Sequence, residues 1–159
     1  MFRSCRLLIS LTLALAYQSA STSICLPETQ IVSASSDVQS RAKAYEEVCV
    51  SNLRTLNTAQ ITYWGGDPQK GYARNLEELG PKGEGLIEPV LASGRKDGYR
   101  FILTPGPADA RGVIKHYTIS ARPLSVLVEG QRSFFTDESC VIRSTRKNRV
   151  ARASDPAIQ

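Results

Sequence analysis

The chain has little of what metal-binding and membrane-spanning proteins need. It contains one histidine, one tryptophan and four cysteines in 159 residues, and no Cys-x-x-Cys pair. This leaves little material for a zinc or haem site. No apolar run approaches the roughly 20 residues of a transmembrane helix. With 42% hydrophobic and 22% charged residues, the composition predicts one globular domain with no integral membrane segment.

The first 23 residues have the order of a secretory signal peptide. Arg3 and Arg6 precede an apolar run at 7–16, and small and polar residues follow it. We expect residues 1–23 to be removed on export, by cleavage within 20–25. An uncleaved anchor remains open as the alternative. The sequence therefore predicts a secreted or periplasmic protein.

Positive charge is concentrated at the two ends of the chain. The formal net charge is +5, but residues 26–142 hold thirteen basic and fourteen acidic residues. We expect residues 144–159 to form a basic, disordered tail. Contact with nucleic acid or another anion is the alternative, although no aromatic residue lies there to stack on bases. The candidate contact residues are Arg143, Arg146, Lys147, Arg149 and Arg152.

A helical period runs from Asp37 to Trp64. Apolar residues recur there at steps of three and four, which predicts an amphipathic helix. Ser36 and Asp37 offer an N-cap, Gly65 and Gly66 end the run, and residues 24–36 are expected to be a mobile lead-in. The predicted buried stripe consists of Val38, Ala42, Tyr45, Cys49, Leu53, Leu56, Ala59 and Tyr63, and the predicted exposed face of Arg41, Lys43, Glu47, Arg54 and Gln60.

After Gly98 the hydrophobic period changes from helical to alternating. A turn-rich stretch at 65–98 precedes this change, with short helical turns expected near 75–80 and 86–94. Four strands are predicted, at residues 99–104, 113–121, 132–136 and 140–143. The fold class is therefore α+β, with a long N-terminal amphipathic helix packed on an antiparallel sheet of about four strands. We expect Tyr45, Leu53, Leu56 and Tyr63 to cover a sheet face formed by Tyr99, Phe101, Tyr117, Ile119 and Phe134.

Several ordered segments resemble the globular headgroup of type IV pilin-like proteins and pseudopilins, in particular those of the acidobacterial kind. The resemblance extends from about Ala42 to Arg143. The segments that carry it are 51–63, 71–72, 75–80, 86–94, 98–101, 132–139 and 141–143. In that family a long N-terminal helix packs on an antiparallel sheet, so the resemblance implies a pilin-like domain at 37–143.

The family's prepilin peptidase site, a glycine before a phenylalanine with a glutamate four residues further on, is absent from this sequence. The resemblance therefore implies an exported, non-enzymatic interaction or structural protein with a pilin-like head. Its partners would be proteins of the cell envelope, the type IV pilus or the type II secretion machinery, and no cofactor or metal is implied. Two alternatives remain open: a nucleic-acid-associated pilin relative that uses the basic tail, and a small secreted hydrolase.

The hydrolase alternative depends on the single histidine. His116 would need Cys25, Cys49 or Cys140 as a nucleophile, and none of these cysteines has a recognisable nucleophile signature around it. The glycine-rich stretch 80–85 lacks the ending of a phosphate-binding loop, so a turn is expected there. The sequence assigns no catalytic, cofactor-binding or metal-binding residue.

Two cysteines depart from the resembling family's pattern. Cys49 lies in the apolar stripe, and Cys140 follows the last hairpin turn, where that family usually has a small glycine. Because both departures occur in one exported chain, we expect a Cys49–Cys140 disulfide, with Cys25 free or paired between chains. Two independent, reduced thiols are the alternative.

Overall fold

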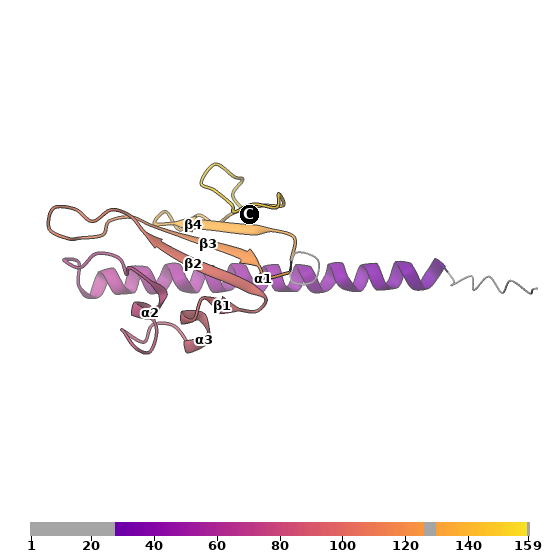
Figure 1. The fold of residues 1–159 in the computed structure, drawn as a ribbon, viewed down its shortest axis with the longest axis horizontal. Coiled ribbons are helices and arrows are strands. Elements are labelled where there is room, and N and C mark those ends of the chain that lie inside the picture. The colour runs from indigo at the N-terminus through magenta and orange to yellow at the C-terminus, as the bar shows by residue number, and fades with distance from the viewer. Residues whose placement is uncertain (1–27, 126–129, 159) are drawn as a thin grey trace, which may run out of the picture.

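One long helix and one antiparallel sheet make up most of the computed structural model, which describes residues 28–125 and 130–158 (Figure 1). Helix α1 (Glu28–Gly66) is followed by two single-turn helices, α2 (Leu76–Leu79) and α3 (Pro89–Ala92). The five strands follow in the order β1-β2-β3-β4-β5: β1 (Arg95–Lys96), β2 (Tyr99–Pro105), β3 (Tyr117–Pro123), β4 (Ser133–Asp137) and β5 (Arg143–Thr145). The α+β prediction is confirmed, with five strands in place of about four. The predicted signal peptide and Cys25 lie outside the described residues.

Helix α1 begins at Glu28 and is longer than predicted. No glycine or proline lies between Glu28 and Gly65, so nothing in the sequence interrupts a helix once it has started. The expected start at a Ser36–Asp37 cap was therefore wrong, and most of the expected lead-in belongs to the helix. The C-terminal half of α1 lies along the sheet and its N-terminal part extends beyond it (Figure 1).

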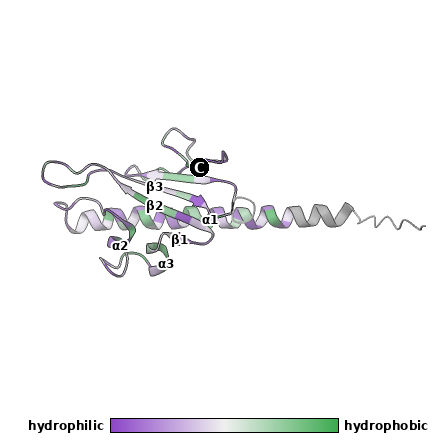
Figure 2. Cartoon of the chain, in the orientation of Figure 1, coloured by the Kyte–Doolittle hydropathy of each residue, from purple (hydrophilic) through white to green (hydrophobic). Residues whose placement is uncertain are grey.

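The core lies between α1 and the inner face of the sheet. Leu53 and Leu56 are fully buried, and Tyr45 and Tyr63 pack against the core from its margins. The sheet side of this core is formed, as predicted, by Tyr99, Phe101, Tyr117, Ile119 and Phe134. Strand β2, which carries both hydrophobic and hydrophilic residues (Figure 2), shows why: its side chains alternate between buried and exposed from Tyr99 to Ile102, because every second side chain of a strand points to the inner face.

Polar side chains complete this core where α1 meets the sheet and the following loop. Asn57 donates to Thr136 Oγ1 over 2.9 Å and accepts a hydrogen bond from the Tyr117 hydroxyl over 3.2 Å. Gln60 accepts from the Ala73 backbone N–H over 2.9 Å and donates to the Ala73 carbonyl over 3.3 Å. Gln60 is thus fully buried, and its expected place on the exposed face was wrong.

Two predicted strands have different bounds in the structure. The strand expected from Val113 begins only at Tyr117, because Ile114 forms isolated bridges with Gly71 and Ala108. Gly71 has φ +80°, and a Cβ atom there would lie 2.2 Å from the Ile114 carbonyl oxygen, so this contact requires glycine.

The strand expected at 140–143 lies instead at Arg143–Thr145. Cys140 has φ 60°, and its N–H donates to the Asp137 carbonyl over 2.9 Å. Cys140 therefore closes a turn and does not begin the strand.

The C-terminal segment, residues 146–158, folds back on the sheet, so the predicted disordered tail is corrected. The Ile158 N–H donates to the Ile142 carbonyl over 2.9 Å, and the Ser144 N–H donates to the Pro156 carbonyl over 3.0 Å. Ile158 packs against the core. These contacts anchor the end of the chain beside β5. Among the described residues, no helix is both long enough and apolar enough to cross a membrane.

Candidate functional site

His116 lies just before β3 and is exposed to solvent. Its Nδ1 atom is 2.6 Å from Glu138 Oε1. Partial burial is the largest single influence and opposes ionisation of Glu138. The hydrogen bond with His116, the hydrogen bonds from the backbone of Glu138 and Tyr117 and the charge of His116 together outweigh it and hold the pKa of that carboxyl below its usual value. In the described part of the chain no hydrogen bond joins His116 to a cysteine. The two side chains therefore form a hydrogen-bonded pair at the surface.

The predicted Cys49–Cys140 disulfide is absent, and both thiols are free. Cys49 is fully buried in the core on α1; burial first, then the nearby carboxylates of Glu46 and Asp97, raise the pKa of its thiol. Such a thiol is chemically inert because the thiolate is the reactive form. Cys140 is exposed in the turn after β4, with its Sγ atom 3.9 Å from the Glu138 carbonyl oxygen. One thiol is therefore buried in the core and the other is exposed in a turn, so the two cysteines do not form the predicted disulfide.

The basic residues predicted to contact anions divide into two groups. Arg143 and Arg149 act within the fold: Arg143 Nη1 donates to the Asp155 carbonyl over 3.0 Å, and Arg149 donates to both carboxylate oxygens of Asp155 over 2.8 and 2.5 Å. The hydrogen bonds from Arg149 first, opposed by partial burial, lower the pKa of Asp155 to about 2. The remaining three, Arg146, Lys147 and Arg152, are exposed.

A partly buried ion pair joins α1 to the chain before β4. Glu46 is 7% exposed, and its Oε1 atom accepts hydrogen bonds from the backbone N–H groups of Gln131 and Arg132 over 2.9 and 3.1 Å. Its Oε2 atom accepts from Arg132 Nε over 2.6 Å. Three donors thus compensate one buried carboxylate. This clamp fixes the helix against the sheet at the place where α1 leaves it.

The projecting segment of α1, residues 36–41, has no buried side chain. Ala42 is the first buried residue among those of the helix from residue 36 onward. Val38, which was predicted to lie in the buried stripe, is 47% exposed because the sheet does not reach it. A cavity of about 340 Å³ lies beside this segment, lined by Gln39, Ala42, Lys43, Glu46, Gln131, Arg132 and Arg146.

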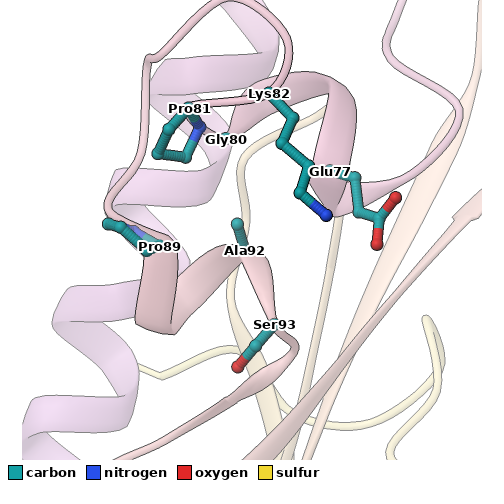
Figure 3. A pocket seen from close by; sticks show the side chains of 7 residues that line it. All are labelled: Glu77, Gly80, Pro81, Lys82, Pro89, Ala92 and Ser93. Atoms are coloured by element: carbon teal, nitrogen blue, oxygen red, sulfur yellow. The ribbon is translucent and has the colours of Figure 1, made fainter.

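A second depression lies between α2 and α3, with a volume of about 260 Å³. Pro81 and Pro89 lie on one side of it, and the side chains of Glu77 and Lys82 on the other (Figure 3). The loop 80–85 beside it is a turn, as predicted, closed by a 2.9 Å hydrogen bond from the Gly83 N–H to the Gly80 carbonyl. The cavity is smaller than usual small-molecule sites, which begin at roughly 300 Å³, and its lining offers no nucleophile–base pair.

The sequence analysis did not predict that Glu46, Asn57 and Gln60 are buried polar residues. The helical spacing indicated this for two of them: Glu46 lies four residues after Ala42, and Gln60 four after Leu56, which places both on the buried side of the helix. Their polar side chains nevertheless favoured an exposed position, because a carboxylate or amide is usually exposed. Among the described residues, no group of three or more histidine, cysteine or acidic side chains is placed to hold a metal ion.

Comparison with known proteins adds no identification. No protein family, no curated protein and no solved structure matches the chain.

Proposed function

We propose that the chain is an exported, non-enzymatic interaction or structural protein with a pilin-like head, acting at the cell envelope with components of the pilus or secretion machinery. The observation that supports this best is the division of α1. Residues from Ala42 onward are covered by an antiparallel sheet, whereas residues 36–41 extend past it with every side chain exposed. The Glu46–Arg132 ion pair holds α1 to the sheet near the middle of the helix, and the projecting segment before it is presented to a partner.

Within residues 28–125 and 130–158, the side chains considered for catalysis are not brought together, which fits a role in binding. Cys49 is buried with a raised thiol pKa, and His116 is engaged by Glu138. The order of residues 1–23 supports the proposed export, and the resemblance over 42–143 supports the proposed pilin-like head. Under this proposal, binding depends on the projecting segment more than on any pocket.

The experiment is site-specific photo-crosslinking in the source cell. A photoreactive residue replaces Val38 in the projecting segment or, as a matched control, Ile61, which is similarly exposed at 49% on the sheet-covered half of the same helix. We expect the Val38 position to crosslink to identified pilus or secretion proteins and the Ile61 position to do so much less.

Two results would overturn the proposal. One is recovery of the chain in the cytoplasm with its first 23 residues intact. The other is an exported chain that forms no crosslink to an envelope or secretion component from the Val38 position.

A further inference from the structure

Three arginines lie side by side on the outer face of the sheet, away from α1. Arg95 on β1 is paired directly with Arg100 on β2, and Arg100 with Arg122 on β3. Directly paired residues of antiparallel strands point to the same face, with Cβ atoms about 5 Å apart. These three residues, the arginine row, therefore cross three strands over about 10 Å.

The arginine row is exposed and poorly neutralised. All three side chains are solvent-exposed, and within residues 28–125 and 130–158 none of them forms an ion pair. Arg122 Nη2 donates to Asn148 Oδ1 over 3.1 Å. Asp97, the acidic residue in the turn between β1 and β2, instead accepts a hydrogen bond from Asn52 on the helix side. The row is thus available to an external anion.

Fold stability does not account for the row. Like charges directly opposite each other destabilise a sheet, so each of the two pairs opposes folding. A charged residue on an edge strand protects that edge from aggregation, which explains Arg95 on β1. It does not explain Arg100 or Arg122, because β2 and β3 are interior strands of the sheet.

The surroundings of the row favour a sugar chain over nucleic acid. On the same outer face, Ser120 lies one outward position from Arg122 and is paired with the exposed Ile102. The paired Thr104 and Thr118 lie one outward position further along, so one hydroxyl group adjoins the guanidinium groups and two more continue the same face. Phe135 is the one aromatic residue that β1 to β5 place on this face, and it is only partly exposed. Single-stranded nucleic acid is usually held by exposed aromatic rings on which the bases stack.

We propose that the arginine row binds one extended chain of an acidic polysaccharide. The planar guanidinium fork of arginine matches a carboxylate with two parallel hydrogen bonds. The hydroxyls of Ser120, Thr104 and Thr118 further along the same face suit the hydroxyls of a sugar chain. This site is separate from the projecting segment, so the inference neither requires nor weakens the proposed function.

The test measures binding of the exported chain to polygalacturonate, a polymer of carboxylated sugars, at low and at moderate salt. The triple variant Arg95→Gln, Arg100→Gln, Arg122→Gln is compared with a control that loses the same charge elsewhere, Arg54→Gln, Arg74→Gln, Lys82→Gln. We expect the row variant to bind at least about tenfold more weakly and with a shallower salt dependence, because fewer counterions are released. The control should stay within about twofold of the original chain.

Folding is checked on the same samples. Removing the opposed arginines should leave the denaturation midpoint unchanged or raise it, so weaker binding cannot be attributed to unfolding. Three outcomes would overturn the proposal: no binding of polygalacturonate by the original chain, equal losses in the two triple variants, or tighter binding of a single-stranded oligonucleotide than of polygalacturonate. Tighter binding of the oligonucleotide would indicate that the arginine row binds nucleic acid instead of a polysaccharide.

Discussion

The two parts of helix α1 share one backbone element and differ in everything around it. From Ala42 to Gln60 every third or fourth side chain is buried, whereas residues 36–41 are all exposed. Composition does not cause the difference, because Val38 would be buried if the sheet extended over it. The comparison shows that helical period alone does not decide burial, since burial needs a second layer at the same place.

The sheet-covered part of α1, from Ala42 onward, also contains buried polar residues, whereas the projecting segment has no buried side chain. Asn57 and Gln60 are buried, and each has partners on another element, Thr136 and Tyr117 for the first and the Ala73 backbone for the second. Such bonds specify the register of the helix on the sheet, because a shift by one residue would leave them unpaired.

The largest difference between the two halves should appear on truncating apolar side chains. Leu56 is fully buried between α1 and the sheet, so Leu56→Ala should lower the free energy of unfolding by about 2–5 kcal/mol. The measurement is denaturant unfolding followed by circular dichroism, with the midpoint and the m-value both recorded.

The matched variant is Val38→Ala, in the projecting segment. Because Val38 is 47% exposed, its truncation should change the unfolding free energy by less than about 0.5 kcal/mol. Equal effects of the two substitutions would contradict the division of the helix into a covered and a projecting part.

A smaller effect is expected for the buried amide. Gln60→Leu keeps a similar volume but leaves the Ala73 N–H and carbonyl without their side-chain partner, so the unfolding free energy should fall by about 1–3 kcal/mol. Gln39→Leu, at an exposed position of the projecting segment, is the control and should change stability by less than about 0.5 kcal/mol. A neutral Gln60→Leu variant would show that the amide does not stabilise the helix register.

Much of the fold was predictable because it depends on local patterns. The stripe through Leu53 and Leu56 and the alternation along β2 each fix which side chains face the core. The caps of α2 also followed from sequence: Asn75 Oδ1 accepts from the Glu78 N–H over 3.0 Å, and Gly80 ends the helix. These features involve residues only a few positions apart.

The errors arose where distant contacts decide the outcome. Nothing local shows that the backbone of Pro156 and Ile158 will pair with Ser144 and Ile142 and so order the basic C-terminal segment. The disulfide prediction failed for a similar reason: the unusual Cys49 and Cys140 were paired without knowing that one would be buried and the other exposed. The projecting segment and the arginine row depend on sheet extent and strand register, which a single sequence specifies only through tertiary packing.

The C-terminal segment, residues 146–158, sharpens the comparison because it is anchored to the sheet, whereas residues 36–41 of α1 project beyond the sheet. Asp155 is buried at 8% exposure and holds Arg149 through both carboxylate oxygens. Its pKa of about 2 in the folded protein lies below the value of about 3.9 expected when unfolded. A lowered carboxyl pKa stabilises the fold above the unfolded value, and this contribution is lost as pH falls through the folded value.

We therefore expect Asp155→Asn to remove a pH-dependent part of the stability that the original chain shows between about pH 4 and pH 2. The measurement is amide hydrogen exchange at neutral pH, followed at Ile158, whose N–H donates to the Ile142 carbonyl, together with unfolding across that pH window. Exchange at Ile158 should become faster in the variant, while the buried N–H groups around Leu56 keep their protection. Equal exchange at Ile158 in both proteins would mean that main-chain pairing beside β5 holds the segment without the Arg149–Asp155 contact.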